Sequence, residues 1–498
     1  IEPFQEAKET PPQTLFAFMR WCLQGSFKIT GLAGVVSASA GVLEVLTALM
    51  LGLVIDAALG SPAVGFFSEN MVLLLGVTAF FIILRPIVLG VSGVMQAVVV
   101  GPNIVNLVMA RVFRHSLGQS VTFFDDDFAG RIAQKQGQVS RAVTDLMVDM
   151  IHTVAFALAS LIGSVILLFT IDARSAALLA LWVAAYILMI RIFMPRIRER
   201  SKVRASKRAM VTGQIVDTIT NIKTVKLFAH DRHEDRAAID AMSEMLDASV
   251  AFGWTSASFR FWLMTLGGML PILLVGTTLY FWTTGTATPG DIAAAGAVAL
   301  RLSQMTGWVS FTLMGMYANV GEIEDGMHTL SPPHTLVDAK NAKEMPRGKG
   351  EIALEQVAFS YGGGPGGLDI VDLHVNPGEK LGLVGASGAG KSTLVALLLR
   401  LYATEPGRIM VKGQDVRDVP QQSLRRQIAM VTQETAMFNR SAHDNIRYGN
   451  PDATAEDIEA AAKQAEAHDF ILGLQAHRGR VGYDAHLGER GVHRGALA

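Results

Sequence analysis

Hydrophobic positions in the first two thirds of the chain form long unbroken runs. Such runs differ from the alternation of a half-buried strand and from the single apolar stripe of a surface helix. About 20 apolar residues are enough for a helix to cross a bilayer. The runs that reach this length lie at 29–55, 71–100, 150–171, 176–194, 261–282 and 291–320. The pattern therefore predicts an all-α membrane region with six transmembrane helices, which returns the chain to its starting side.

The links between these spans are of two kinds. Those near residues 60–65 and 283–290 are short and nearly uncharged, whereas those at 110–146 and 195–246 are long, polar and mostly free of helix breakers. Arg191 to Arg208 carries eight Lys or Arg and one acid, Glu199. Cationic loops stay on the cytoplasmic side. We therefore expect the long links to be helices that extend into the cytoplasm.

The character of the chain changes after a Pro-, Lys- and Gly-rich linker at 331–350. Segments 351–361, 378–385 and 427–433 have the pattern of strands, the second of them apolar and buried, and 393–402 has the pattern of a helix. This arrangement is typical of an α/β nucleotide-binding domain. The predicted organisation is an N-terminal cytoplasmic segment (1–28), a transmembrane domain (29–330), the linker, and a nucleotide-binding domain (351–498).

Composition agrees with a membrane protein, because 50% of the residues are hydrophobic and only 17% are charged. A net charge of −1 gives no indication of nucleic-acid binding. Cys22 is the only cysteine, which excludes an internal disulfide framework. The polar start of the chain has neither the basic nor the apolar stretch of a signal peptide.

One motif carries phosphate chemistry. Residues 385–393 read GASGAGKST and fit the pattern G-x-x-x-x-G-K-[ST] between a predicted strand and a predicted helix. Glycines let backbone amides close around phosphates, and the helix N-terminus favours an anion. Lys391 is expected to reach the β- and γ-phosphates of ATP, and Ser392 to ligate Mg²⁺. The candidate ATP-binding residues of the loop are Gly385, Ala386, Ser387, Gly388, Ala389, Gly390, Lys391, Ser392 and Thr393.

Ionisable residues also interrupt the apolar spans. Glu44 and Arg85 lie at similar depth in the hairpin of the first two spans, so we expect them to pair, since charges in a membrane are rarely left alone. Arg301 and Gln304, one turn apart, and Arg260, nearer the cytoplasm, are candidates for a substrate cavity. Interhelical hydrogen bonding or snorkelling to the interface is the alternative for these three.

With six spans and then a P-loop domain, the chain resembles an ATP-binding cassette (ABC) exporter of the half-transporter type. The resemblance implies that Tyr361, 24 residues before Gly385, stacks on adenine. It implies that Gln433, 42 residues after Lys391, touches Mg²⁺ and senses the membrane domain. Segment 123–132 resembles the first coupling helix of the family, and segment 218–234 resembles the approach to the second. In the family these helices transmit motion to the cassette. The coupling residues implied are Phe124, Asp125, Phe228 and Glu234.

The resemblance stops near the end of the chain. The family's GERG segment is present at 488–491, but HRGALA follows in place of the signature sequence, the Walker B strand with its general base, and the switch His. The expectation is therefore a cassette incomplete at its C-terminus, either a truncated or frame-shifted exporter or a genuine short product. No residue of this sequence is assigned as the catalytic base.

The resemblance thus implies ATP-driven export or flipping of an unidentified substrate by a homodimer or heterodimer in a lipid bilayer, with ATP and Mg²⁺. A bacterial inner membrane, with the nucleotide-binding domain in the cytoplasm, is the expected location. The alternative is a nucleotide-binding membrane subunit with a regulatory or partner role and no hydrolysis of its own. Whether this chain hydrolyses ATP is left open by the sequence.

Overall fold

The computed structural model describes residues 1–7, 9–125, 129–346, 348–361, 367–403, 406–432, 437–475 and 479–487. The chain divides into two compact units, Ile1–Val337 and Asp338–Ala498. Each unit is described by itself.

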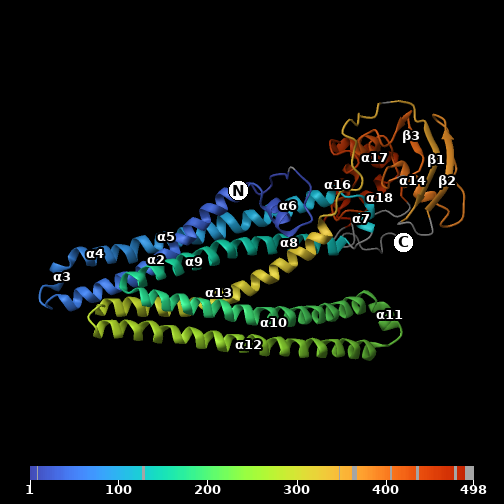
Figure 1. Cartoon of the computed structure of the whole chain (residues 1–498). Helices are drawn as coiled ribbons and strands as arrows, with labels where there is room; N and C mark the ends of the chain where they lie inside the picture. Colours follow the sequence, from blue (N-terminus) through green and yellow to red (C-terminus); the bar gives the residue numbers. More distant parts are fainter. Residues whose placement is uncertain are drawn as a thin grey trace. The chain divides into compact units, whose positions relative to one another are not determined.

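The first unit is helical throughout its regular structure, with long helices that lie side by side (Figure 1). Three of its segments, labelled η1 to η3, are π-helical turns within longer helical stretches. The elements are α1 (Leu15–Leu23), α2 (Phe27–Gly60), α3 (Phe66–Glu69), α4 (Met71–Ala79), η1 (Phe80–Leu84), α5 (Arg85–Val94), η2 (Met95–Val100), α6 (Gly101–Leu117), α7 (Val121–Asp125), α8 (Ala129–Asp149), η3 (Met150–Ala155), α9 (Phe156–Ile171), α10 (Ala173–Thr220), α11 (Ile222–Leu227), α12 (Asp231–Thr283) and α13 (Pro289–Leu330).

Within the described residues, five uninterrupted helical stretches are long and apolar enough to cross a membrane: Phe27–Gly60, Met71–Leu117, Gly130–Ile171, Ala173–Thr220 and Arg232–Thr283. They contain the first five predicted spans. The sixth prediction, 291–320, forms a continuous helix inside α13 but is not among these five. Polar residues such as Asp291, Arg301 and Gln304 lower the hydropathy of that helix.

Two glycines allow α2 and α13 to approach closely. A Cβ on Gly52 would lie 2.8 Å from the Gly290 carbonyl oxygen, so a side chain at this position would push the helices apart. The Asp56 carboxylate accepts hydrogen bonds from the Gly290 amide (2.6 Å) and from the Thr288 hydroxyl (2.7 Å), which fastens the start of α13 to the end of α2. This contact fixes the register between the two helices.

The long helices α10 and α12 run along one another and are joined at one end by α11 (Figure 1). The Arg204 guanidinium lies 3.9 Å from the centroid of the Phe252 ring, and Lys207 pairs with Glu244 at 2.5 Å. These contacts hold together the polar parts of the two helices, which lie beyond their apolar segments. The prediction that the long links are helical extensions is confirmed here.

The start of the chain is fastened to α6 by a buried arginine. Arg111 is 2% exposed and donates to the backbone carbonyls of Trp21 (2.7 Å), Cys22 (3.0 Å) and Gln24 (2.7 Å). It therefore satisfies carbonyls at the C-terminus of α1 that the helix itself leaves unpaired. Burial raises the pKa of the Cys22 thiol, so this cysteine is an unreactive packing residue.

The second unit contains a four-stranded antiparallel sheet in the order β2-β1-β3-β4. Its core is formed by apolar residues of the strands and of α14, among them Leu354, Val357, Leu397 and Ile409. The elements are β1 (Ile352–Ser360), β2 (Gly367–Val375), α14 (Lys391–Leu398), β3 (Arg408–Val411), β4 (Gln414–Asp415), α15 (Gln421–Arg425), α16 (Ala442–Arg447), α17 (Ala455–Gln464), α18 (His468–Leu472) and a 3₁₀ turn, η4 (Gly482–Asp484).

Two strand predictions in this unit are wrong. Residues 378–385 and the described part of 427–433 form no strand, and Val384 and Val431 are each 98% exposed. A strand needs a neighbour for its backbone N–H and C=O groups, and no described strand supplies one here. The apolar pattern of these segments suits a buried strand, but it does not supply a neighbouring strand for their backbone hydrogen bonds.

Candidate nucleotide-binding site and membrane-domain residues

The P-loop lies immediately before α14, as the motif predicts. Gly388 and Gly390 have φ angles of +83° and +84°, a conformation that L side chains rarely adopt. A Cβ on Gly390 would also lie 2.8 Å from the carbonyl oxygen of Gly367 at the start of β2. Glycine at position 390 therefore permits both the turn and the close approach of the loop to the sheet.

Lys391 is the first residue of α14 and folds back over the loop. Its Nζ donates to the carbonyl oxygens of Gly385 (2.9 Å) and Ala386 (2.8 Å). The loop residues before Gly390 are exposed, so the loop and the amine are open to a ligand. A cation beside a helix N-terminus and a glycine turn is a donor set that suits phosphate groups.

The residues available for Mg²⁺ are described only in part. Ser392 is exposed in the first turn of α14, and its hydroxyl oxygen is the kind of ligand that Mg²⁺ accepts. Gln433 lies outside the described residues. Within the part of the chain that the structure covers, no cluster of three or more His, Cys, Asp or Glu side chains forms a metal site of its own. An Mg²⁺ ion that enters with ATP fits this arrangement.

Tyr361 lies beside the P-loop helix. Its hydroxyl and that of Thr393 on α14 are 3.1 Å apart, and its ring packs edge-on against Phe359 and Tyr402. The side chain is nevertheless 47% exposed. Its ring is therefore supported from one side and open on another, which suits stacking against a planar base.

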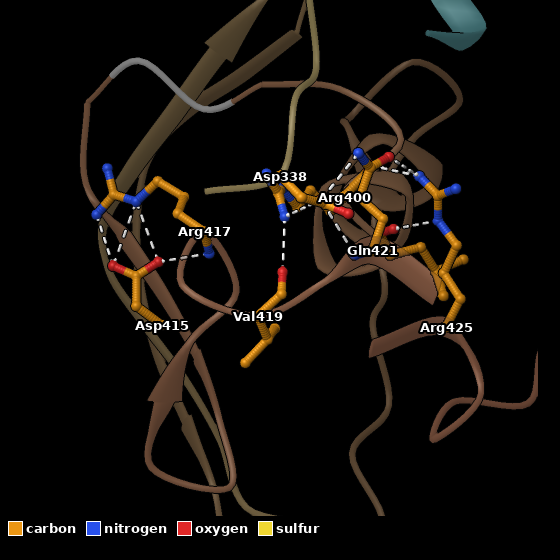
Figure 2. Close-up of polar contacts among 8 residues, drawn as sticks. Asp338, Arg400, Asp415, Arg417, Val419, Gln421 and Arg425 are labelled. Carbon is orange, nitrogen blue, oxygen red and sulfur yellow. Dashed lines mark hydrogen bonds and ion pairs between the residues drawn. The ribbon is translucent and has the colours of Figure 1, made fainter. Parts of the chain in front are cut away.

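A polar network joins the far end of α14 to the beginning of this unit (Figure 2). Arg425 donates to the carbonyl oxygens of Leu399 (3.1 Å) and Arg400 (2.7 Å), which α14 leaves unpaired at its C-terminus. Arg400, 7% exposed, donates in turn to Asp338 (3.1 Å) and to the Val419 carbonyl (2.9 Å). The P-loop helix is therefore held at the end opposite to its phosphate-binding turn.

The pKa values in this unit follow from its ion pairs. Burial by itself would raise the pKa of Asp415, but hydrogen bonds from the side chain and the backbone N–H of Arg417, together with the charge of Arg417, outweigh it and lower the pKa below its ordinary value. Figure 2 shows the paired contact between the two groups. Burial, aided by the charge of nearby Arg400, lowers the pKa of Arg425. Neither residue touches the P-loop, so both support the fold of the cassette.

The proposed coupling residues occupy different environments. Phe124 on α7 and Phe228 after α11 are 40% and 62% exposed, as a docking surface requires. Asp125 ends α7 and is also exposed. Glu234 instead accepts hydrogen bonds from Thr218 (3.0 Å) and Gln214 (3.3 Å) on α10. Its carboxylate therefore fastens α12 to α10 close to the α11 tip.

The predicted pair inside the membrane domain is confirmed. Arg85 Nη2 donates to Glu44 Oε1 at 3.1 Å. The sequence reading missed that Arg301 joins them, with its Nε 3.3 Å from Glu44 Oε2. The sequence carries no local signal for this contact, because it depends on the close crossing of α2 and α13 at Gly52 and Gly290. Gln304 and Arg260 are both exposed, and Arg260 lies on another helix, α12.

Two family models match the chain. The model described as ABC transporter transmembrane region matches residues 30–305, and the model described as ABC transporter matches residues 368–481. The first match lies in the first unit, and the second match lies in the second unit and contains the P-loop and α14.

The chain also resembles whole proteins. It is 36% identical to an uncharacterized ABC transporter ATP-binding protein of Haemophilus influenzae, over 99% of this chain and 80% of that protein. It is 32% identical to the beta-(1-->2)glucan export ATP-binding/permease protein NdvA of Brucella suis, over 68% of this chain and 55% of the relative. The putative multidrug export ATP-binding/permease protein YgaD of Bacillus subtilis is 26% identical, over 77% of this chain and 66% of its own length. The chain therefore spans from about half to four fifths of the length of these relatives.

A solved structure shares the fold. The structure of a bacterial Atm1-family ABC exporter with ATP bound superposes with a TM-score of 0.80 and 21% identity, over 94% of this chain and 81% of the other. The predicted fold class, a membrane all-α domain followed by a sheet-containing nucleotide-binding domain, is confirmed. With apolar spans, a P-loop in its structural context and matches to both family models, this chain belongs to the ABC transporter family.

Proposed function

We propose that this chain is one half of an ATP-driven exporter that acts as a dimer in a bacterial inner membrane, with its cassette in the cytoplasm. The observation that carries the proposal is the open P-loop at the start of α14, in a chain that also has helices of membrane-span character. Relatives named for glucan and multidrug export support the direction of transport. The substrate is considered separately below.

Each described residue of the site has a proposed role in binding ATP. Backbone amides of the glycine turn and the N-terminus of α14 hold the phosphates. Lys391 leaves the Gly385 and Ala386 carbonyls and turns to the β- and γ-phosphates, where it balances their negative charge. Ser392 offers a hydroxyl to Mg²⁺, which supplies further charge neutralisation when bound. Tyr361 supports the base.

We propose that movement of the cassettes is transmitted to the membrane domain through α7 and the segment around α11. Phe124 on α7 and Phe228 directly after α11 are large exposed apolar side chains, and we propose that each docks on a cassette. Glu234 joins α12 to α10 close to α11, so we propose that a displacement of the tip moves α10 and α12 together.

The test is to measure nucleotide binding and hydrolysis separately, in the chain reconstituted in nanodiscs. Fluorescent ATP should bind in the presence of Mg²⁺, and Lys391→Ala should weaken binding by about tenfold or more, because it removes a charge-assisted contact to phosphate. ATP turnover that disappears in Lys391→Ala supports the exporter. Binding without turnover supports the alternative, a nucleotide-binding subunit that hydrolyses no ATP. Equal binding by wild type and Lys391→Ala contradicts both.

A further inference from the structure

Two arginines in the membrane domain share one carboxylate. Glu44 on α2 accepts a hydrogen bond from Arg85, the first residue of α5, and forms an ion pair with Arg301 on α13. The three helices thus bring two positive charges and one negative charge together. The group keeps a net charge of +1, which is costly inside an apolar region and is usually retained for function.

The charges are unequally exposed. The Glu44 side chain is 7% exposed, whereas those of Arg85 and Arg301 are 34% and 41% exposed. The negative member is therefore covered, and the two positive members remain accessible. A ligand that reaches this cluster meets guanidinium groups, and the carboxylate lies behind them.

Some buried nitrogen atoms of this cluster also have no hydrogen-bond partner. Arg85 Nε and Arg301 Nε are buried with no hydrogen-bond partner among the described residues, although Arg301 Nε faces Glu44 as an ion pair. His152 Nδ1, nearby on η3, is buried and unpartnered in the same way. A buried donor without a partner destabilises the structure. An acceptor-rich ligand would recover part of this cost.

An aromatic wall stands beside the charged group. Arg301 Cζ is 5.9 Å from the centroid of the Phe156 ring, and Phe156 and His152 each pack edge-on against Trp308 at 6.1 and 6.0 Å. The π-helical turn η1 ends immediately before Arg85, and η3 ends immediately before Phe156. Such turns change the direction of the side chains that follow and are frequent at functional sites.

We propose that Arg85 and Arg301 bind the anionic group of an amphiphilic substrate, a phosphate or carboxylate headgroup, and that its apolar tail lies along the partly exposed ring of Trp308. The proposal rests on the exporter function above and specifies the class of its substrate. Arginine suits the role because its planar fork of donors matches the oxygens of carboxylate and phosphate. A cationic amphiphile is disfavoured by the net charge of the cluster.

The test uses the full chain in nanodiscs of neutral phosphatidylcholine and three fluorescent probes with the same alkyl tail, ending in phosphate, carboxylate or trimethylammonium. The wild type should bind at least one anionic probe about tenfold tighter than the cationic one, as expected for one or two charge-assisted hydrogen bonds. The two anionic probes show which headgroup is preferred. Equal binding of all three probes overturns the proposal.

Two substitutions and a control separate ligand binding from a structural role. Arg301→Gln should weaken binding of the preferred anionic probe by about tenfold. Glu44→Gln should strengthen it, because the competing carboxylate is gone and both arginines remain; a purely structural ion pair predicts no such gain. Arg174→Gln removes an exposed arginine of α10 and should leave probe binding unchanged. Unchanged binding in both cluster variants overturns the proposal.

Measuring nucleotide binding in the same samples separates failure of the substrate-class proposal from failure of the exporter proposal. If Arg301→Gln and Glu44→Gln retain the ATP affinity of the wild type, the chain is folded and the probe results judge the substrate class alone. If the wild type binds no nucleotide, the exporter proposal fails by itself, whatever the probes show.

Discussion

Arg85 Nη2 lies 3.1 Å from Glu44 Oε1, although 41 residues separate the two along the chain. This hydrogen bond joins two helices of the first predicted hairpin and makes Glu44 the centre of a group that includes Arg301. Removing one of the three residues should therefore cost a different amount of stability for each, because Glu44 pairs with both arginines and each arginine pairs only with Glu44 within this group.

Glu44→Ala should destabilise the membrane domain more than Arg85→Ala does. Removing the carboxylate leaves two arginines unpaired, whereas removing Arg85 leaves Glu44 paired with Arg301. Loss of a partner from a fully buried pair costs about 3–5 kcal/mol, and the partial exposure of the arginines reduces this. Thermal unfolding in nanodiscs measures the order. A larger loss in Arg85→Ala would contradict the shared arrangement.

The glycine crossing between α2 and α13 gives a second prediction. Gly290→Ala places a Cβ 2.3 Å from the Gly52 carbonyl oxygen and should destabilise the domain by about 1–3 kcal/mol through overpacking. Gly307→Ala is the matched control in the same helix, since nothing lies within 4 Å of its added Cβ. Alanine has a higher helix propensity than glycine, so Gly307→Ala should leave the stability of the domain equal or slightly raised. Equal thermal midpoints for the two variants would refute the close crossing.

Tyr361 can be tested by separating its ring from its hydroxyl. Tyr361→Phe loses only the hydrogen bond with Thr393 and should keep nucleotide affinity, whereas Tyr361→Ala should weaken it by about two- to tenfold, the range of an aromatic stacking contact. Titration with fluorescent ATP and with tripolyphosphate is the measurement. The alanine variant should lose affinity for ATP and not for tripolyphosphate. A loss for both would show that Tyr361 only supports α14.

The cassette should lose stability in acid through Asp415. Its pKa is lowered in the folded state by Arg417, so the stabilisation is complete above the ordinary pKa of an aspartate and disappears as the pH falls through the lowered folded value. Arg417→Met should therefore move the acid-unfolding midpoint to higher pH. Arg426→Met, which changes an exposed arginine directly after α15, is the control. Coincident acid-unfolding curves for Arg417→Met and the wild type would show that the pair adds no stability.

The sequence predicted those features that depend on local pattern. Long apolar runs identify spans, and Gly388, Gly390 and Lys391 identify a phosphate loop, because the chemistry requires those residue types at that spacing. Equal depth in a hairpin was enough to pair Glu44 with Arg85. These inferences need only helix geometry and the cost of charge in an apolar medium.

Features that depend on a distant neighbour were not predicted. Residues 378–385 and 427–433 have apolar strand patterns, but a strand forms only where another strand supplies its hydrogen bonds. The contact of Arg301 with Glu44 depends on the Gly52–Gly290 crossing, which no local pattern marks. The role of Glu234 in holding α10 likewise appears only when the two long helices lie side by side.

The central claim, that ATP at Lys391 drives the membrane domain, can be measured with one reporter cysteine. Gln304→Cys places an exposed thiol on α13, and native Cys22, buried with a raised pKa, gives little background. The rate of labelling by a water-soluble maleimide should change several-fold when Mg²⁺ and ATP are added in nanodiscs, and Lys391→Ala should abolish the change. A labelling rate that ignores ATP, or a change that persists in Lys391→Ala, would contradict the account.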